Sequence, residues 1–465
     1  MTDQAPHSGA DNAWAPYAPD ERTPWNLRRV IHLHRRAGFA ATWSEIQRDL
    51  KDSPKACIDR FLAGNAVKEG VAERFAETAD LLADRVGGAV HNGERLKAWW
   101  IYRMLLGPDP LTERLTLMWH NHFATGIAKI RHLRMMRRQN DIFRELARAP
   151  FGKLLQTVVR DPALLIWLDA PENRKGHANE NLGRELMELF TLGIGHYAEK
   201  DVKEAARALT GWTVEDDHFK ENGDLHDDGQ KTVLGRTGKW KGNDLLKMLL
   251  DHPATAKRLA FRLCEHFMGE NAVPAAALES LASGLRAHEL DIGWGVETVL
   301  RSRAFFADAN LGTRVLGPVE YAVGSARALA MFDPPPSTLL LSEWTARLGQ
   351  DLFDPPNVGG WRGGRNWIST QSMIGRANFV AALVSGDLFR GRESLDALAQ
   401  PSHNGRGDSL EDIVNFYAEL LLGGRVSPAW CERILTSLGT KATASPETAR
   451  RGVILILASP EAQLG

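Results

Sequence analysis

Cysteines are scarce in this sequence, and so are long apolar runs. The three cysteines, Cys57, Cys264 and Cys431, lie far apart and form no Cys-x-x-Cys pair. They therefore make neither a zinc knuckle nor a disulfide framework, and such usage fits a reducing compartment. No apolar run approaches the ~20 residues that a helix needs to cross a bilayer, so the sequence predicts no membrane span.

An excess of one charge and a secretion signal are lacking as well. The 57 Lys and Arg residues balance 58 Asp and Glu residues, for a net charge of −1, which gives no general reason to expect nucleic acid as a partner. Residues 1–24 lack a basic segment followed by an apolar one, so they are predicted to form a polar arm and not a signal peptide. The default location is then the cytoplasm, and export bound to a signal-bearing partner stays open.

The common motifs of nucleotide and hydrolase chemistry are missing. The sequence contains no phosphate-binding loop of the Gly-x4-Gly-Lys type, no Gly-x-Gly-x-x-Gly after a strand, no Gly-x-Ser-x-Gly elbow and no His-Glu-x-x-His helix. Each of these patterns places the groups that its chemistry needs. Any active site must therefore use another arrangement.

Helical periodicity is the main pattern that is present. It predicts a mainly α fold, with a large multi-helix domain over residues 25–390 and a small β-hairpin excursion around 213–238. Residues 391–409 are predicted to be a flexible connection, and 410–465 a C-terminal helical segment packed on the main domain. Capping boxes predict helix starts at Thr42, with Glu45, and at Asp201, with Glu204.

The run "WHNHF" contains the first candidates for chemistry, His120 and His122. Two imidazoles at i and i+2 point to the same side of an extended segment, where they can share a metal ion. On a helix they diverge by about 200°, and the apolar residues before them predict the last turn of a helix. The alternative is that one ring favours the helix C-terminus and the other packs on Trp119.

The run "NENLGRELMELFTLG" (179–193) has a polar face at helical spacing. An apolar face opposite it is typical of a surface helix, and Glu180 with Arg184 is an i, i+4 ion pair. Glu185 differs, because it lies at the boundary between the two faces. Together with Glu188 it shows the i, i+3 offset that carboxylate-rich metal sites use.

Two loops carry further polar candidates. The turn "HDDGQK" contains His226, Asp227 and Lys231, which offer a metal ligand and a general base, although Asp before Gly is also an ordinary turn former. The loop that leads into the 179–193 helix is rich in Pro, Gly and Asn, and binding groups often collect on such loops. Its Asp169, Asn173, His177 and Asn179 could line a cleft. Asn181, on the polar face of the helix that follows, is a further candidate ligand-binding residue.

The run "FDPPNVGGWRGGRNW" carries Trp361 and Trp367 among paired prolines and glycines. Their rings can stack on a flat ligand such as a sugar or a base. The alternative is that they fasten the loop to the core. The basic run at 129–138 is interpreted as a solvated face.

Taken together, these runs resemble a large bacterial family known as a domain of unknown function, number eighteen hundred. The resemblance covers residues 25–390 and rests on seven runs: "HLHRRAGFAAT", "ERLTLMWHNHFATG", "LLIWLDAPENRKGHANENLGRELMELFTLG", "YAEKDVKEAARALTGW", "HDDGQKTVLGRTG", "HPATAKRLAFRL" and "FDPPNVGGWRGGRNWI". It implies a mostly helical protein, often encoded beside an exported sulfatase-like protein. It also implies that the polar positions define the family, among them Glu204, Arg207 and Trp212.

The leading hypothesis is a metal-dependent enzyme, an oxidoreductase or a hydrolase, with its site between helices. The metal ligands would be His120, His122, Glu185 and His226, a mixed set that suits iron, manganese, zinc or copper. Glu188 or Asp227 would act as base or orient a ligand, and Arg184 would hold an anionic group. The alternative is a non-catalytic binding or maturation partner of an exported sulfatase-like protein or of a polysaccharide. That partner would recognise its target through the Trp361 and Trp367 loop and the basic run at 129–138.

Overall fold

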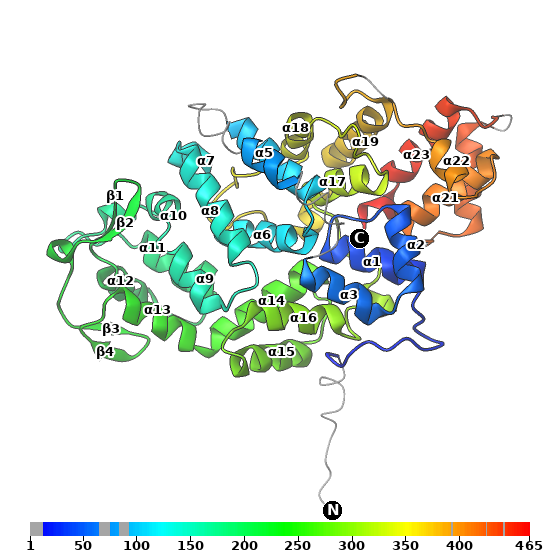
Figure 1. The fold of residues 1–465 in the computed structure, drawn as a ribbon. Coiled ribbons are helices and arrows are strands. Elements are labelled where there is room, and N and C mark those ends of the chain that lie inside the picture. The colour runs from blue at the N-terminus through cyan, green and yellow to red at the C-terminus, as the bar shows by residue number, and fades with distance from the viewer. Residues whose placement is uncertain (1–12, 65–74, 83–92, 392–393, 425, 440–441) are drawn as a thin grey trace, which may run out of the picture.

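The computed structural model describes residues 13–64, 75–82, 93–391, 394–424, 426–439 and 442–465. Its fold is mainly α, as predicted, with two small hairpins. Figure 1 shows an elongated body with the hairpins at one end and the C-terminal helices at the other. No helix in the described ranges combines the length and the apolar character needed to cross a membrane.

The first half of the chain builds one end and the middle of the body. Its helices are α1 (Leu27–Ala37), α2 (Trp43–Lys51), α3 (Pro54–Ala63), α5 (Gly93–Leu106), α6 (Pro110–His122), α7 (Ile127–Ile130), α8 (Leu133–Glu145), α9 (Phe151–Val158) and α10 (Pro162–Trp167). The Thr42 capping box is confirmed, because Thr42 Oγ1 accepts the Glu45 N–H and Glu45 Oε2 accepts the Thr42 N–H. Of the predicted N-terminal arm, residues 1–12 lie outside the described residues. Residues 13–24 pack on the body, where the Trp14 indole donates to Ala277 O.

The middle of the chain forms the hairpin end. It comprises α11 (Asn181–Glu185), a π-helix η2 (Leu186–Thr191), α12 (Glu199–Ala208), β1 (Trp212–Glu215), β2 (His218–Glu221), β3 (Lys231–Val233), β4 (Arg236–Gly238) and α13 (Gly242–Asp251). Helix α12 begins earlier than predicted. Asp201 is its third residue and accepts the Ala198 N–H, so the acidic side chain caps from inside the helix.

The β excursion is two antiparallel hairpins, not one. β1 pairs with β2 and β3 pairs with β4. Their turns are Asp216–Asp217 and Leu234–Gly235, which all have positive φ, as two-residue hairpin turns require. Asn222-Gly223 and Asp228-Gly229, which have the usual turn sequence, lie between the hairpins instead.

The second half of the chain supplies the remaining helices. They are α14 (Pro253–Phe267), α15 (Ala275–Ala287), α16 (Ile292–Arg301), α17 (Pro318–Ala328), α18 (Thr338–Arg347), α19 (Thr370–Ser385), α20 (Ala399–His403), α21 (Leu410–Leu422), α22 (Pro428–Leu438) and α23 (Pro446–Ala458). Helix α20 lies within the predicted connection. Helix α23 packs against both α19 and α21, and the fully buried Arg376 of α19 donates to Gln463 Oε1 beyond α23.

Two apolar clusters form the core. One lies under α6, α9, α14 and α16, and the other joins α5, α17, α19 and α21. Helix α6 contributes to both, and almost every residue of it is buried. The two predicted histidines therefore lie at the end of a helix that runs through the middle of the core.

Candidate functional site

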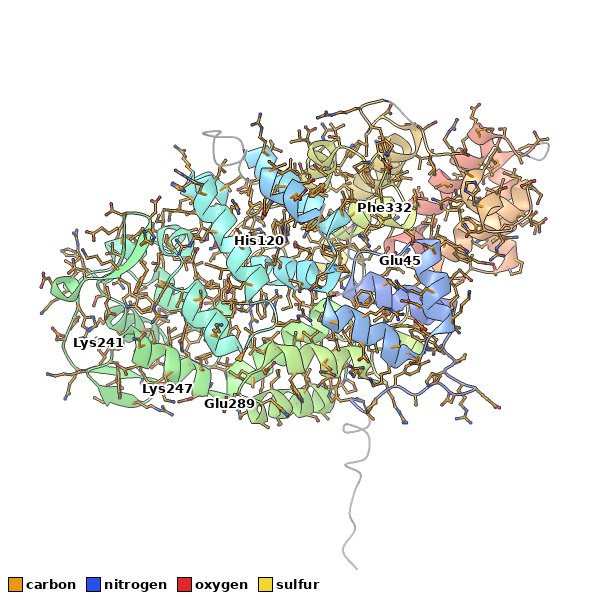
Figure 2. All side chains as sticks on the ribbon, viewed as in Figure 1. Glu45, His120, Lys241, Lys247, Glu289 and Phe332 are labelled. Carbon is orange, nitrogen blue, oxygen red and sulfur yellow. The ribbon has the colours of Figure 1, made fainter. Side chains whose placement is uncertain are left out.

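His120 lies in the last turn of α6 and is buried among aromatic rings. Figure 2 shows it among the helices of the body, whereas the exposed Lys241 and Lys247 lie at the edge. Its Nε2 accepts the Phe353 N–H at 3.1 Å, and the rings of Trp100 and Phe353 pack against it. Burial lowers the pKa of His120 to about 3. The imidazole is therefore neutral, and it fixes the backbone where the predicted Trp loop begins.

His122 points to a different neighbour. Its Nε2 donates to Phe190 O at 3.1 Å, and Phe190 belongs to the π-helix η2. A π-helix leaves carbonyls outside the usual i to i+4 pattern, so this bond satisfies one of them. Burial, together with the positive charges of Arg262 and Arg258, lowers the pKa of His122 well below its ordinary value. The two rings therefore serve two separate backbone segments.

Asn121, between the histidines, holds the Trp loop directly. Its Oδ1 accepts the Trp361 N–H at 2.7 Å, and its Nδ2 donates to Trp361 O at 3.2 Å. Gly360 has φ 71° and lies so close that a Cβ would come within 2.2 Å of Asn121 Oδ1. The "WHNHF" run thus anchors the segment 353–361.

Glu185 and Glu188 lie on the helix that changes from α to π between them. Glu188 accepts a 2.6 Å hydrogen bond from the Tyr197 hydroxyl. Glu185 is half-buried, and its carboxyl group makes no hydrogen bond to the described residues. Burial and the neighbouring Glu188 raise the pKa of Glu185 to about 7. Arg184 turns to the surface, where it pairs with Glu180 and Glu199.

The "HDDGQK" turn is a compact network that holds a hairpin on α12. The imidazole of His226, which is buried, bonds Thr210 O through Nδ1 at 3.0 Å. Asp227 pairs with Arg207 at 2.8 Å, and that contact lowers the pKa of Asp227 to about 2. The Lys231 ammonium, also buried, donates to Asp227 O and to Gly229 O. The side chains of His226, Asp227 and Lys231 therefore all bond groups of the turn itself or of α12 and the residues just after it.

The residues predicted from the 169–181 loop also bond one another. Asp169, in the left-handed region, accepts from the Asn181 side chain at 3.1 Å and pairs with Lys129 at 2.6 Å. Asn173 is buried, donates to Ala206 O and accepts the Asn179 N–H. These contacts fasten the start of α11 to α12.

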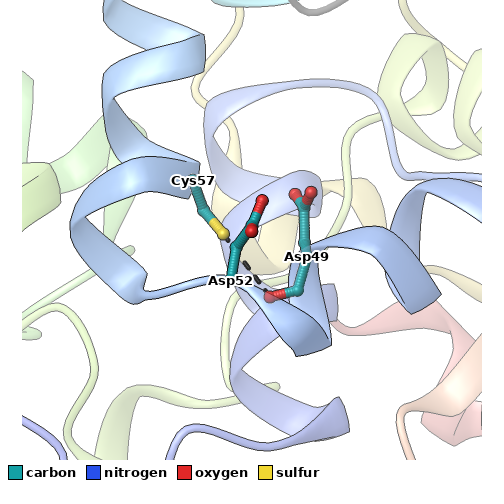
Figure 3. A group of neighbouring side chains, drawn as sticks. All are labelled: Asp49, Asp52 and Cys57. Atoms are coloured by element: carbon teal, nitrogen blue, oxygen red, sulfur yellow. Dashed lines mark hydrogen bonds between the residues drawn. The ribbon is translucent and has the colours of Figure 1, made fainter.

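The four predicted metal ligands do not assemble. His120 and His122 bond different backbone groups, and His226 lies in the hairpin network. Among the described residues, one group of His, Cys, Asp and Glu brings three ligand atoms within 4.8 Å of one another: Asp49, Asp52 and Cys57 (Figure 3).

That group does not fit a metal ion. Asp49 is bonded by His34 at 2.8 Å and by Arg60 at 2.6 Å, and Arg60 also pairs with Asp52 at 2.7 Å. Burial raises the pKa of Cys57 to about 12, and the Cys57 thiol lies 3.5 Å from Asp49 O as a donor. A metal-binding cysteine is a thiolate, whereas Cys57 is a protonated thiol. The two carboxylates are already paired with the guanidinium group of Arg60.

A cleft of about 440 Å³ opens beside the Trp loop. Its walls come from α6, from α14, from the segment before and at the start of α17, and from the loop 361–367. The polar and aromatic residues that line it are Arg114, Asn121, Arg262, Glu265, His266, Glu270, Asn271, Thr313, Arg314, Glu320, Gln350, Trp361, Arg362, Arg365 and Trp367. Two of the predicted ligand-binding residues, Trp361 and Trp367, therefore lie on a cleft.

The inner wall of the cleft is built from buried charge. Arg114 and Glu320 are buried and paired, and Arg314 bonds both Glu320 oxygens at 2.8 and 2.9 Å. Arg262 pairs with Glu265 at 2.8 Å. Burial and the charges of Arg114 and Arg314 lower the pKa of His266 well below its ordinary value. The imidazole is thus neutral beside several guanidinium groups.

These inner-wall residues are missing from the sequence-based candidates. Arg114, Arg262 and Arg314 come from three distant parts of the chain. Arg114 and Arg262 lie within two of the runs that carry the family resemblance, but neither was singled out for its chemistry. One signal was present: Arg114 stands in the apolar run "LTERLTLMW", where a charge is expensive to bury unless it is paired.

Comparison with known proteins adds a family and little else. The family model "Protein of unknown function (DUF1800)" matches residues 32–464. Neither a curated protein nor a solved structure matches the chain.

Proposed function

We propose that this chain, which belongs to the DUF1800 family of proteins of unknown function, is a binding protein for an acidic carbohydrate. The observation that carries the proposal is the lining of the cleft, where two tryptophans and five arginines share one cavity. Function resides in such sites and not in the fold. The cleft is therefore the basis for assigning the ligand.

The tryptophans provide the surface for a ring. Trp361 is buried, Asn121 bonds its backbone N–H and C=O, and its ring packs against His120. Trp367 is half-buried at the rim. A large aromatic face next to groups that donate and accept hydrogen bonds suits a sugar, whose C–H faces are apolar and whose edges are polar.

The charges favour an acidic ligand. The cleft contains five arginines against three glutamates. Glu320 and Glu265 are already paired with arginines, while Arg362 and Arg365 are exposed on the loop. Opposite charge in a cleft concentrates the ligand and orients it.

The metal-dependent reaction stays a prediction from the sequence, as does the sulfatase-like partner. The contacts of His120, His122 and His226 account for these rings as anchors of backbone. The Trp loop, by contrast, lies on a cavity with the charge for a ligand. That difference favours the binding function over the metal-dependent enzyme.

Calorimetry on the full chain tests the proposal. We expect binding of sulfated and uronate-containing oligosaccharides, and at least tenfold weaker binding of a neutral oligosaccharide of the same length. Trp367→Ala should weaken the acidic oligosaccharides at least tenfold. Trp240→Ala, a half-buried indole near the hairpins, is the matched control and should leave them unchanged.

Other outcomes overturn the proposal. Equal affinity for neutral and acidic oligosaccharides would show that the cleft arginines do not select an acidic ligand. Binding of adenosine monophosphate with no binding of any sugar would identify a nucleotide site instead. Unchanged affinity in Trp367→Ala, with the fold verified by circular dichroism, would place the ligand elsewhere.

A further inference from the structure

Three guanidinium groups of the inner cleft are bonded in the same way. Arg114 uses Nη1 for Glu320, Arg314 uses Nη1 for both oxygens of Glu320, and Arg262 uses Nη1 for Glu265. Within the described residues, Nε and Nη2 of all three side chains carry no hydrogen bond. Each arginine is therefore fixed through one nitrogen and keeps one edge free.

The free edge is the one that binds oxyanions. The N–H groups of Nε and Nη2 are parallel and form the fork that matches two oxygens of a carboxylate, phosphate or sulfate. In Arg114 this edge is fully buried, and unpaired buried donors are costly. A ligand that supplied oxygens there would remove that cost.

His266 adds a fourth unpartnered group in the same place. It lines the cleft, and its Nε2 is buried without a hydrogen bond in the described structure. Arg114, Arg262 and Arg314 line the same cleft as His266, and their positive charges act on its ring together with the opposing charge of Glu320. The free groups thus belong to the inner wall of one cleft.

We propose that this inner end is an oxyanion subsite, in which Arg114, Arg262, Arg314 and His266 bind the sulfate or phosphate ester of the acidic carbohydrate. The inference rests on the proposed function and defines its ligand more closely. A carboxylate has two oxygens in one plane and fits one guanidinium fork. A sulfate or phosphate ester has three terminal oxygens in a tetrahedral arrangement, which allows several forks to bind at once.

The surrounding charges agree with a bound anion. Of the carboxylates in the wall, Glu320 is paired with Arg114 and Arg314, and Glu265 with Arg262. Glu270 is exposed and lies against Gly364 on the loop side. Because burial and these arginines keep His266 neutral, its ring contributes hydrogen bonding and not charge.

The experiment uses the full chain with inorganic sulfate and inorganic phosphate as probes, followed by calorimetry, with acetate as the carboxylate control. We expect sulfate and phosphate to bind at least tenfold more tightly than acetate. Arg314→Gln and Arg262→Gln, which replace part-exposed arginines, should each weaken sulfate binding at least tenfold. Arg347→Gln, on the exposed face of α18, should not change it.

A second measurement isolates His266. His266→Phe should weaken sulfate several-fold, and in the parent protein sulfate affinity should stay level between about pH 6 and 8, because a neutral ring does not titrate there. Steadily tighter binding toward the acid end would mean that His266 must be charged, which contradicts the subsite as described.

The outcomes separate this inference from the proposed function. Equal affinity for acetate and sulfate, or full sulfate binding by Arg314→Gln, overturns the oxyanion subsite while uronate binding at Trp367 leaves the proposed function standing. Tight binding of sulfate by the parent protein, with no binding of any carbohydrate, overturns the proposed function and leaves the anion-binding site standing.

Discussion

The Asn121 side-chain amide bonds both backbone groups of Trp361: Oδ1 accepts the Trp361 N–H at 2.7 Å, and Nδ2 donates to Trp361 O at 3.2 Å. The two residues are 240 positions apart in the sequence. Their contact joins two motifs that are far apart in the chain, the "WHNHF" run and the Trp loop. One forms the end of a core helix, and the other is the loop that this helix end positions over the cleft.

Asn121→Ala removes both hydrogen bonds and leaves two backbone groups to find new partners. Each hydrogen bond contributes on the order of 0.5–1.5 kcal/mol, so we expect a loss of about 1–3 kcal/mol in the free energy of unfolding, measured with urea. Limited proteolysis should show new cleavage within 353–367. Asn366→Ala, an exposed residue of the same loop, is the control, and equal effects of the two would deny Asn121 its special role.

Gly360→Ala tests the close approach of the same loop. Gly360 and Gly235 have similar φ, 71° and 76°, but a Cβ meets Asn121 Oδ1 at 2.2 Å in the first and nothing within 4 Å in the second. A non-glycine residue in this region costs about 1–2 kcal/mol, so Gly235→Ala should lose about that much. Gly360→Ala should lose at least twice as much in urea unfolding, and equal losses would rule out the clash.

His122→Ala distinguishes an anchor from a metal ligand. The ring donates to Phe190 O and packs against Trp119 and Phe123, so its loss should destabilise the protein by about 2–4 kcal/mol. His177→Ala, at an exposed position, should have almost no effect. Metal content, measured by elemental analysis, should be the same in all three proteins. A fall confined to His122→Ala would restore the metal hypothesis.

Much of the fold could be predicted from local pattern. Apolar spacing identified α6 and placed both histidines in its last turn, and the Thr42 cap marked the start of α2. A small β-hairpin excursion was predicted around 213–238, and the structure has two hairpins there, whose turns are Asp216–Asp217 and Leu234–Gly235. Local sequence favours a turn, but the register of the strands decides where it lies.

The candidate site was less predictable, because tertiary partners define it. In the π-helix that begins at Leu186, Phe190 O and Leu189 O accept hydrogen bonds from His122 and Arg258, which lie on other helices. The cleft arginines likewise meet only after folding. Trp361 and Trp367 were candidates from the sequence, since aromatic residues in a Gly-rich loop are informative without their neighbours, and both line the cleft.

Glu320→Gln tests the buried pair that forms the inner wall of the cleft. Arg114 and Arg314 hold the pKa of Glu320 far below its ordinary value despite its burial. A carboxylate with a depressed pKa stabilises the fold above its unfolded pKa of about 4.3 and loses that contribution as pH falls toward the folded value. At pH near 7 the substitution should therefore cost roughly 3–5 kcal/mol, because it leaves two guanidinium groups without their anion.

The check on Glu320 is the difference in urea stability between parent and variant at several pH values. That difference should be largest near neutral pH and should shrink below about pH 4. Glu343→Gln, which removes an exposed i, i+4 partner of Arg347, should show a small and constant difference. A constant difference for Glu320→Gln would mean that its charge is not what stabilises the wall.

Glu185→Gln should stabilise the protein above neutral pH, in contrast to Glu320→Gln, which should destabilise it there. Because burial and Glu188 raise the pKa of Glu185 to about 7, the folded state binds a proton that the unfolded state releases near pH 4.3. The parent protein therefore loses stability as pH rises from about 4.3 to 7, and the loss is complete above 7. Since Glu185 is partly exposed, solvent screening limits the effect to roughly 1 kcal/mol.

At pH 8 the Glu185→Gln variant should have a higher melting temperature than the parent protein, and near pH 4 the two melting temperatures should coincide. Glu172→Gln, an exposed carboxyl nearby, should follow the parent at both values, and a variant that melts lower at pH 8 would show that Glu185 is charged and paired in the folded protein.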